Sequence, residues 1–138
     1  MKTIPITERA QIVRTDFSDQ AAWESLMAAA RSPADPFIFN LDFLDERERG
    51  GATVEQLLAA LPEDYPHSFL VIADSVAMAQ TDHPLLVLDL FEDRGRVFRA
   101  PAAEVPSIEN NLSIANMDFA EFADAADEGG IFHGFPEM

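Results

Sequence analysis

Two nearly uninterrupted apolar runs, SFLVIAD (68–74) and PLLVLDL (84–90), constrain the fold of this chain more than any other feature. A strand with one face in water alternates apolar and polar residues, whereas a continuous apolar run is typical of a strand covered on both faces. Strands of that kind lie in the middle of a sheet that has helices on either side. The two runs therefore predict an α/β protein in which they form the central strands.

Three further segments are rich in β-branched or aromatic residues and are predicted as strands: QIVRTDF (11–17), FIFNLDF (37–43) and RVFRA (96–100). The turn signal EDRG (92–95) makes the last of them the hairpin partner of 84–90. The charged stretch DERERGG (45–51) is interpreted as a surface loop, and SVAMAQTDH (75–83) as a plain connection between strands.

Apolar residues at helical spacing predict four helices between and after these strands. A first helix is expected to begin at Ser18, and its buried stripe consists of Trp23, Leu26, Met27 and Ala30. Thr53 and Gln56 have the spacing of a capping box for the second helix. A short helix from Pro106 and a last helix from Asp118 follow the final strand.

The last helix is expected to run from Asp118 to Gly129-Gly130, with one apolar face on the core and one acidic face in water. Ile131, Phe132 and Phe135 are then expected to fold back onto the core. The complete order is β-α-β-α-β-β-β-α-α. It predicts a mixed β-sheet of about five strands with helices packed on it.

The length of 138 residues suits a single acidic α/β domain over 1–138, with its core in about 11–135. Cysteine is absent, which excludes disulfides and catalytic thiols and favours a cytoplasmic location. Pro5, Glu8 and Arg9 interrupt the start of the chain, where a secretory signal needs an apolar stretch. No run has the length that spans a bilayer.

The charge balance points to the kind of partner. Nine Lys and Arg residues stand against 25 Asp and Glu residues, a formal net charge of −16. This charge repels phosphate backbones and anionic lipid head groups, so neither nucleic acid nor a membrane is an expected partner. A basic protein, a metal ion or a cationic small molecule would be attracted, although acidity that serves only solubility is the alternative.

An aspartate lies at or near the end of each of four apolar strands: Asp16, Asp42, Asp74 and Asp89. The carboxyl ends of parallel strands meet at one edge of a sheet, where ligands bind in α/β proteins. Three converging carboxylates would form a site suited to Mg²⁺, Mn²⁺ or Ca²⁺. The alternative is that each aspartate caps or turns its own loop, with Asp16 bonded to the amides of the helix that begins near Ser18.

Arg14 lies inside a predicted strand, where a guanidinium is costly unless a carboxylate pairs with it. Asp16 is on the same face two residues later, and Asp42 or Asp89 could come from a neighbouring strand. A buried Arg-Asp network is one interpretation, and anion recognition by Arg14 is the other.

Three asparagines interrupt the helical region near the C-terminus: Asn110, Asn111 and Asn116. Asn116 is expected to be the left-handed hinge between the two helices, because asparagine tolerates that conformation. Asn110 and Asn111 are poor helix formers, and their amides are expected to bond to nearby backbone, for example at a sheet edge. The functional alternative is that the three amides line a polar pocket and bind a ligand.

Familiar signatures of chemistry are absent from the sequence. His67, His83 and His133 are scattered and have no metal-ligand spacing. No GxSxG, Walker or GxGxxG pattern occurs. The sequence therefore assigns no catalytic residue, no metal ligand and no cofactor.

Four strings together resemble a known family: VRTDFSDQAAWESL (13–26), LPEDYPHSFLVIAD (61–74), HPLLVLDL (83–90) and ENNLSIANMDFAEFADA (109–125). The family is a widespread bacterial group of small single-domain proteins, classified as a domain of unknown function, with related sequences in some eukaryotes. The resemblance covers about residues 11 to 135. It implies a single domain and draws attention to Arg14, Asp16 and the three asparagines, but it implies no role for them.

Two function hypotheses follow. The first is a non-enzymatic, acidic protein-interaction module, either regulatory or, by analogy with small acidic inhibitors of cationic toxins, of the immunity or antitoxin kind. The second is a small-molecule binder or a divalent-metal-dependent enzyme that uses the strand-end aspartates with Arg14 and the asparagines.

Overall fold

Five strands form the sheet at the centre of the protein: β1 (Ala10–Arg14), β2 (Leu41–Leu44), β3 (Phe69–Ala73), β4 (Pro84–Asp89) and β5 (Val97–Pro101). The computed structural model describes residues 1–32 and 38–134. The strand order is β2-β1-β3-β4-β5. Strand β1 is parallel to β2 and to β3, whereas β3–β4 and β4–β5 are antiparallel pairs. The predicted mixed sheet and its hairpin are confirmed.

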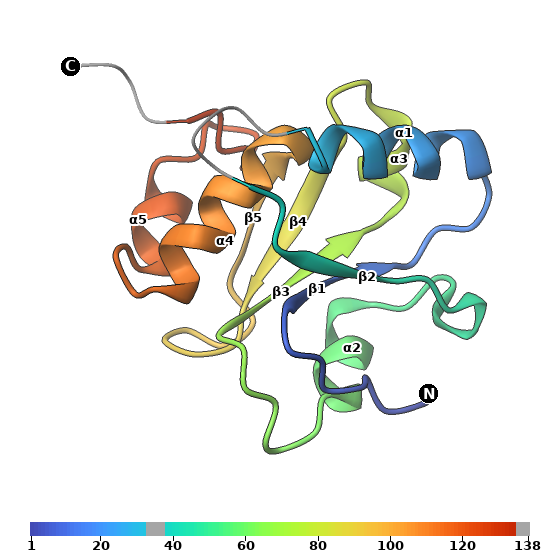
Figure 1. Cartoon of the computed structure of the whole chain (residues 1–138), viewed down its shortest axis with the longest axis horizontal. Coiled ribbons are helices and arrows are strands. Elements are labelled where there is room, and N and C mark those ends of the chain that lie inside the picture. Colours follow the sequence, from blue (N-terminus) through green and yellow to red (C-terminus); the bar gives the residue numbers. More distant parts are fainter. Residues whose placement is uncertain (33–37, 135–138) are drawn as a thin grey trace.

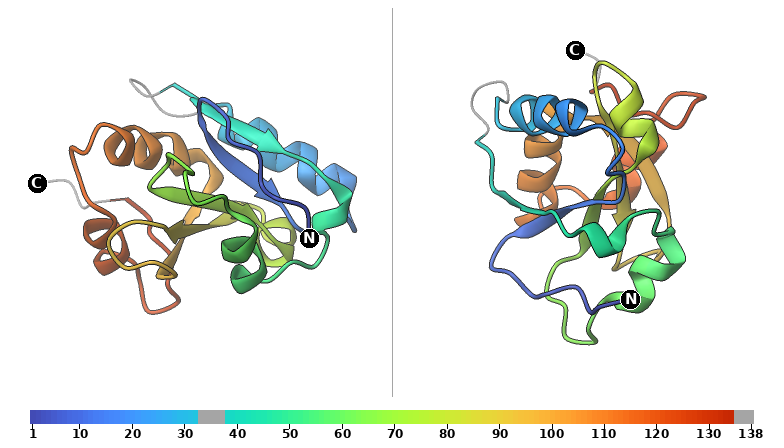
Figure 2. Two further views of the ribbon diagram at one scale, coloured as in Figure 1. Left: turned by 90° about the horizontal axis from the view of Figure 1, so that it is seen from below. Right: turned by 90° about the vertical axis from the view of Figure 1, so that its right-hand side faces the viewer.

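Helices cover both faces of this sheet (Figure 1, Figure 2). They are α1 (Gln20–Ala30), α2 (Val54–Ala60), α3 (Ser75–Ala79), α4 (Val105–Ser113) and α5 (Phe119–Asp124), with short 3₁₀ turns η1 (Arg47–Arg49) and η2 (Ala102–Glu104). Buried residues of α1, α3, α4 and α5 belong to one core cluster, and those of α2 belong to a second. The chain is thus a single α/β domain with a mixed sheet between two helical layers.

The central strands contribute alternate residues to the two core clusters, as their apolar sequences predict. Ile12 and Val71 pack with Trp23 of α1, whereas Val13 and Leu70 belong to the cluster of α2. All residues of β1 and β3 are buried. Covering both faces removes apolar surface from water on each side, which is the main favourable contribution to folding.

Two helix starts differ from the sequence prediction. The side chain of Asp19, and not that of Ser18, accepts the capping hydrogen bond of α1, from the amide of Ala22 at 3.0 Å. The segment 75–83, predicted as a plain connection, begins with α3, because Asp74 accepts a bond from the amide of Ala77 at 3.1 Å. In both cases a short carboxylate that follows extended backbone starts the helix.

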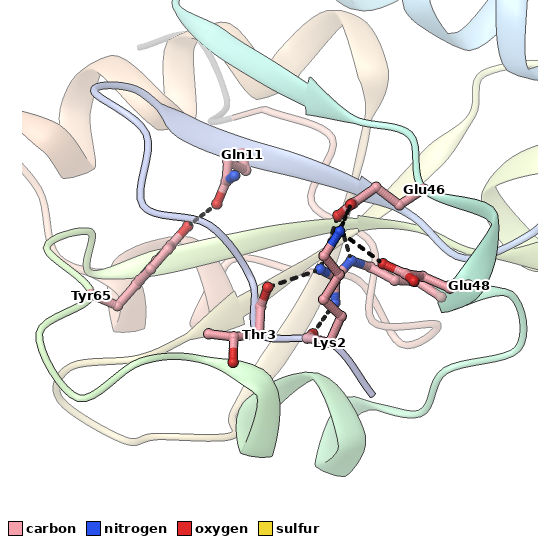
Figure 3. A network of polar contacts seen from close by, with 7 residues as sticks. Lys2, Thr3, Gln11, Glu46, Glu48 and Tyr65 are labelled. Carbon is pink, nitrogen blue, oxygen red and sulfur yellow. Dashed lines mark hydrogen bonds and ion pairs between the residues drawn. The ribbon is translucent and has the colours of Figure 1, made fainter.

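The segment 45–51 is mostly exposed, as predicted for a surface loop, but it contains the short turn η1, and Arg49 within it is 0% exposed. Its guanidinium donates to the carboxylate of Glu46 at 2.9 Å and 3.1 Å. It also donates to the carbonyls of Lys2 at 2.8 Å and Thr3 at 3.2 Å. Figure 3 shows Lys2 beside Glu46 and Glu48, with Tyr65 bonded to Gln11 nearby. Arg49 thereby fastens the first residues of the chain to the sheet layer.

The last helix is shorter than predicted, because α5 ends at Asp124. Asp127 then accepts bonds from the amides of Gly129 and Ile131, which lower the pKa of its carboxyl together with the nearby His133. A side chain that binds backbone amides in this way competes with the helix. Phe132 is buried and its ring packs edge-on against Phe122, as predicted, whereas Phe135 lies outside the described residues.

The second predicted strand, 37–43, is observed as β2 from Leu41 to Leu44, and residues 33–37 lie outside the described part of the chain. Within the described part, no helix combines the length and the apolar character that crossing a membrane requires.

Candidate functional site

The order of the parallel strands creates a switch point at the carboxyl edge of the sheet. After β1 the chain crosses through α1 to β2 on one side, and it then crosses through α2 to β3 on the other side of β1. Loops diverge there and leave a crevice, which is where open α/β sheets bind ligands. Asp16 follows β1 and Asp74 follows β3, so two of the four aspartates meet at this edge.

A cavity of about 530 Å³ occupies this edge, and we call it the switch-point cavity. Its lining consists of Thr15, Asp16, Phe17, Ser18, Arg47, Gly50, Gly51, Ala52, Asp74 and Ser75. The loop between β2 and α2 is tied to the end of β1, because the amide of Gly51 donates to the carbonyl of Thr15 at 2.8 Å. Gly51 has a φ of +74°, a conformation that costs glycine little.

Asp74 is neutralised inside the protein. Arg99 of β5 reaches across β4 and binds both of its oxygens, at 2.7 Å and 3.0 Å. One of these oxygens also caps α3. Asp16 instead accepts from the amide of Ser18 at 2.9 Å, the local turn that the sequence allowed, and it has no ion-pair partner in the described part of the chain.

The other two aspartates lie elsewhere, so the four do not converge on a shared centre. Asp42 lies within β2 opposite Gln11, and its side chain is 3.7 Å from Arg9. Asp89 ends the antiparallel strand β4 and lies at the opposite edge of the sheet from Asp74. Over residues 1–32 and 38–134, no three His, Asp or Glu side chains gather closely enough to hold a metal ion.

Arg14 forms a buried network, but its carboxylate partner was not among the predicted ones. The residue is 2% exposed, and its guanidinium is 3.4 Å from Asp45. It donates to the backbone carbonyl of Asp16 at 2.9 Å and to Gln20 at 3.0 Å. Its carbon Cζ also lies 4.4 Å from the ring centroid of Phe17. Arg14 is thus occupied by the fold, beneath the wall of the switch-point cavity.

A second cavity, of about 490 Å³, lies at the opposite edge, between the β4–β5 hairpin and the corner of α4 and α5. We call it the acidic groove, and its lining consists of Pro66, Ser68, Asp89, Phe91, Glu92, Leu112, Ala115, Asn116, Met117, Asp118, Phe119 and Glu121. Among these lining residues there are four carboxylates and no basic side chain.

Three of the four carboxylates in the acidic groove are exposed: Glu92, Asp118 and Glu121. Asp118 and Glu121 form the predicted capping box, with bonds of 3.0 Å and 3.3 Å that engage one oxygen of each. Their other oxygens can accept a bond from a ligand. Asp89 is buried and braces the hairpin, because it accepts from the amides of Phe91 and Asp93 at 2.9 Å.

Apolar side chains lie beside these charges. Phe91 is 76% exposed, which is unusual for a phenylalanine and leaves its ring free for a partner. Leu112, Met117 and Phe119 form the inner wall of the groove. Next to the groove, Ile114 is 65% exposed at the end of α4. An apolar surface with a charged rim is typical of interaction sites.

The asparagines shape this corner, and one of their predicted roles is confirmed, because Asn111 bonds to nearby backbone, whereas the predicted hinge at Asn116 is wrong. The left-handed residue is Ala115, with φ of 56°, and not Asn116. The side chain of Asn116 donates to that of Asn111 at 2.8 Å, and Asn111 donates to the carbonyl of Ser107 at 2.9 Å. These bonds brace the helix corner, not a sheet edge, and Asn110 is exposed outside both cavities.

Several residues of the two cavities were not found from the sequence. Arg47 falls in the predicted surface loop 45–51 and Glu92 in the predicted turn 92–95, whereas Phe91 lies between the predicted strand 84–90 and that turn. The one usable signal for the groove was Phe91, an aromatic residue directly before the polar turn 92–95. A side chain at such a position has no neighbouring strand to pack against.

Fold and surface define a class: a small acidic α/β protein with a mixed five-stranded sheet, the switch-point cavity at one edge of it and the acidic groove at the opposite edge. Residues 9–135 match the family described as a domain of unknown function, DUF6924, and the chain belongs to this family. This confirms the resemblance that the four sequence strings indicated. No curated protein sequence matches the chain.

Proposed function

We propose that this protein is a non-enzymatic, acidic protein-interaction module whose acidic groove binds a basic segment of a partner protein. The proposal depends above all on the lining of the groove, where four carboxylates lie among apolar side chains and no lining residue is basic. The formal charge of −16 adds a long-range attraction that accelerates encounter with a cationic partner.

The groove also indicates the chemistry of the partner segment. Arginine suits it better than lysine, because a planar guanidinium can bind a carboxylate with two parallel bonds and can also stack on an aromatic ring. Both possibilities exist here, with Glu92 beside the exposed ring of Phe91. We therefore propose a segment that combines arginines with one apolar residue for the inner wall.

Two biological settings fit this binding mode. A cationic toxin-like partner would make the protein an immunity or antitoxin factor, and another basic protein would make it a regulator. The absence of cysteine suits a reducing compartment, so we propose that the encounter takes place in the cytoplasm.

Affinity capture with three baits tests the proposal. The baits are the native chain, the groove variant E92Q/D118N/E121Q, and the control variant E55Q/E63Q/D64N. Both variants lose the same number of negative charges, and the amide side chains that replace Asp118 and Glu121 can still form the capping box. The control positions are exposed and lie in or after α2, which covers the other face of the sheet.

We expect a basic protein from the source organism to be retained by the native and control baits and lost from the groove variant. Retention should weaken as salt is raised, because exposed charges are screened. If the groove variant retains the same protein as strongly as the control variant does, or if retention does not change with salt, the proposal is wrong.

A further inference from the structure

The switch-point cavity differs from the acidic groove in its charge. Three charged side chains line it: Asp16, Arg47 and Asp74. Asp74 is neutralised by Arg99 at 2.7 Å, so one carboxylate and one guanidinium remain. This balanced lining contrasts with that of the acidic groove, where four carboxylates have no basic side chain among the lining residues.

The two remaining charges do not neutralise each other. Within the described residues, neither Asp16 nor Arg47 takes part in a salt bridge. The guanidinium of Arg47 lies 5.9 Å from the ring centroid of Phe17, which also lines the cavity. Opposite charges that line one cavity without pairing leave room for a ligand that carries both complementary charges.

Simpler ligands fit this lining less well. A ligand with only a negative charge would bind Arg47 but would be repelled by Asp16. A ligand with only a positive charge would bind Asp16 but would be repelled by Arg47. A divalent cation would find one free carboxylate, because Asp74 is already held by Arg99 and α3. The exposed hydroxyls of Ser18 and Ser75 supply neutral donors and acceptors beside the charges.

We propose that the switch-point cavity binds a free α-amino acid, with the ligand carboxylate on Arg47 and the ligand ammonium on Asp16. Its volume of about 530 Å³ lies within the range of roughly 300–1,000 Å³ that small-molecule pockets have. Its position at the β1/β3 switch point is where the loops of such a sheet bind ligands. The site is separate from the acidic groove, so it does not depend on the proposed interaction function.

Calorimetric titration of the native chain with each of the twenty free L-amino acids tests the proposal, with acetate and methylammonium as single-charge probes. The variants D16N and R47Q each remove one charge. The asparagine that replaces Asp16 retains an oxygen to accept from the Ser18 amide, and Arg47 is exposed, so both variants should fold. R94Q is the matched control, because Arg94 is also exposed and without a salt bridge in the described part of the chain, and it lies outside this cavity.

We expect at least one amino acid to bind and neither single-charge probe to bind. D16N and R47Q should each weaken binding by about tenfold or more, because each removes a bond to a charged group. R94Q and the groove variant E92Q/D118N/E121Q should bind as the native chain does. Binding of no amino acid, equal binding of acetate, or equal effects of R47Q and R94Q would each overturn the proposal.

Discussion

Replacing Arg49 with methionine should destabilise the protein strongly. Methionine is similar in length but cannot donate, so the carbonyls of Lys2 and Thr3 lose their hydrogen-bond donor. Among the described residues, Glu46, whose side chain is 27% exposed, then keeps only Lys2 at 3.7 Å as a cationic partner. Removing one member of a buried ion pair costs about 3–5 kcal/mol, and the partial exposure of Glu46 places this case near 3 kcal/mol.

Urea unfolding followed by circular dichroism measures this loss. With an m-value of about 2 kcal/mol/M, the R49M midpoint should fall by about 1.5 M at unchanged slope. R47M is the control, because Arg47 is exposed, and its unfolding free energy should change by about 0.5 kcal/mol or less. The amide of Ile4, which donates to Ala60 at 2.8 Å, should also exchange faster in R49M. A loss below about 1 kcal/mol, or a loss equal to that of R47M, would refute the reasoning.

Three further substitutions test individual features of the fold. Burial raises the pKa of the Glu109 carboxyl, although the hydrogen bond from Asn40 opposes this shift. The folded state therefore holds this proton more tightly than the unfolded state does. Stability should fall as the pH rises from the ordinary pKa of glutamate through the raised pKa. E109Q should remove that fall and be more stable than the native chain at neutral pH in denaturant titrations; an unchanged pH profile would contradict this. Y65F removes the hydroxyl that donates to Gln11 at 2.7 Å and should lower the free energy of unfolding in urea by about 1 kcal/mol. An unchanged free energy would mean that water takes the place of the hydroxyl as the hydrogen-bond donor to Gln11. A115G should stabilise the chain by about 1 kcal/mol in thermal unfolding, because Ala115 has a φ of 56°, and a lower melting temperature would show that its methyl group packs.

Features that depend on local sequence were predictable. The uninterrupted runs around Val71 and Val87 identified the covered strands, because burial on both faces removes the polar alternation. The capping boxes at Thr53 and Asp118 were found, since each depends on two residues three positions apart.

Strand direction was not predictable from the same patterns. An apolar run has no orientation, and the antiparallel pairing of β4 with β3 placed Asp89 at the edge opposite Asp74. The partner of Arg14 is Asp45, which is 31 positions away and belongs to a loop that had been assigned to the surface. Contacts of this kind depend on how the crossovers pack and not on any single segment.

The cavities could not be predicted from the sequence either, because they also depend on how distant segments pack. The acidic groove combines the segment before β3, the β4–β5 turn and the α4–α5 corner, which are distant in the chain. Charge alone indicated a basic partner, but it did not indicate which of 25 carboxylates would meet that partner. Only the fold gathers Glu92, Asp118 and Glu121 beside an exposed phenylalanine.

We propose that the acidic groove, and not the acidic surface as a whole, recognises a basic segment. Amide chemical shifts of the labelled chain, followed during titration with a short peptide of alternating arginine and leucine, test this most directly. We expect shifts concentrated at Phe91, Glu92, Ala115, Met117 and Phe119, which are lost in F91S and reduced by salt. Shifts of similar size along α2, or a titration that F91S leaves unchanged, would contradict it.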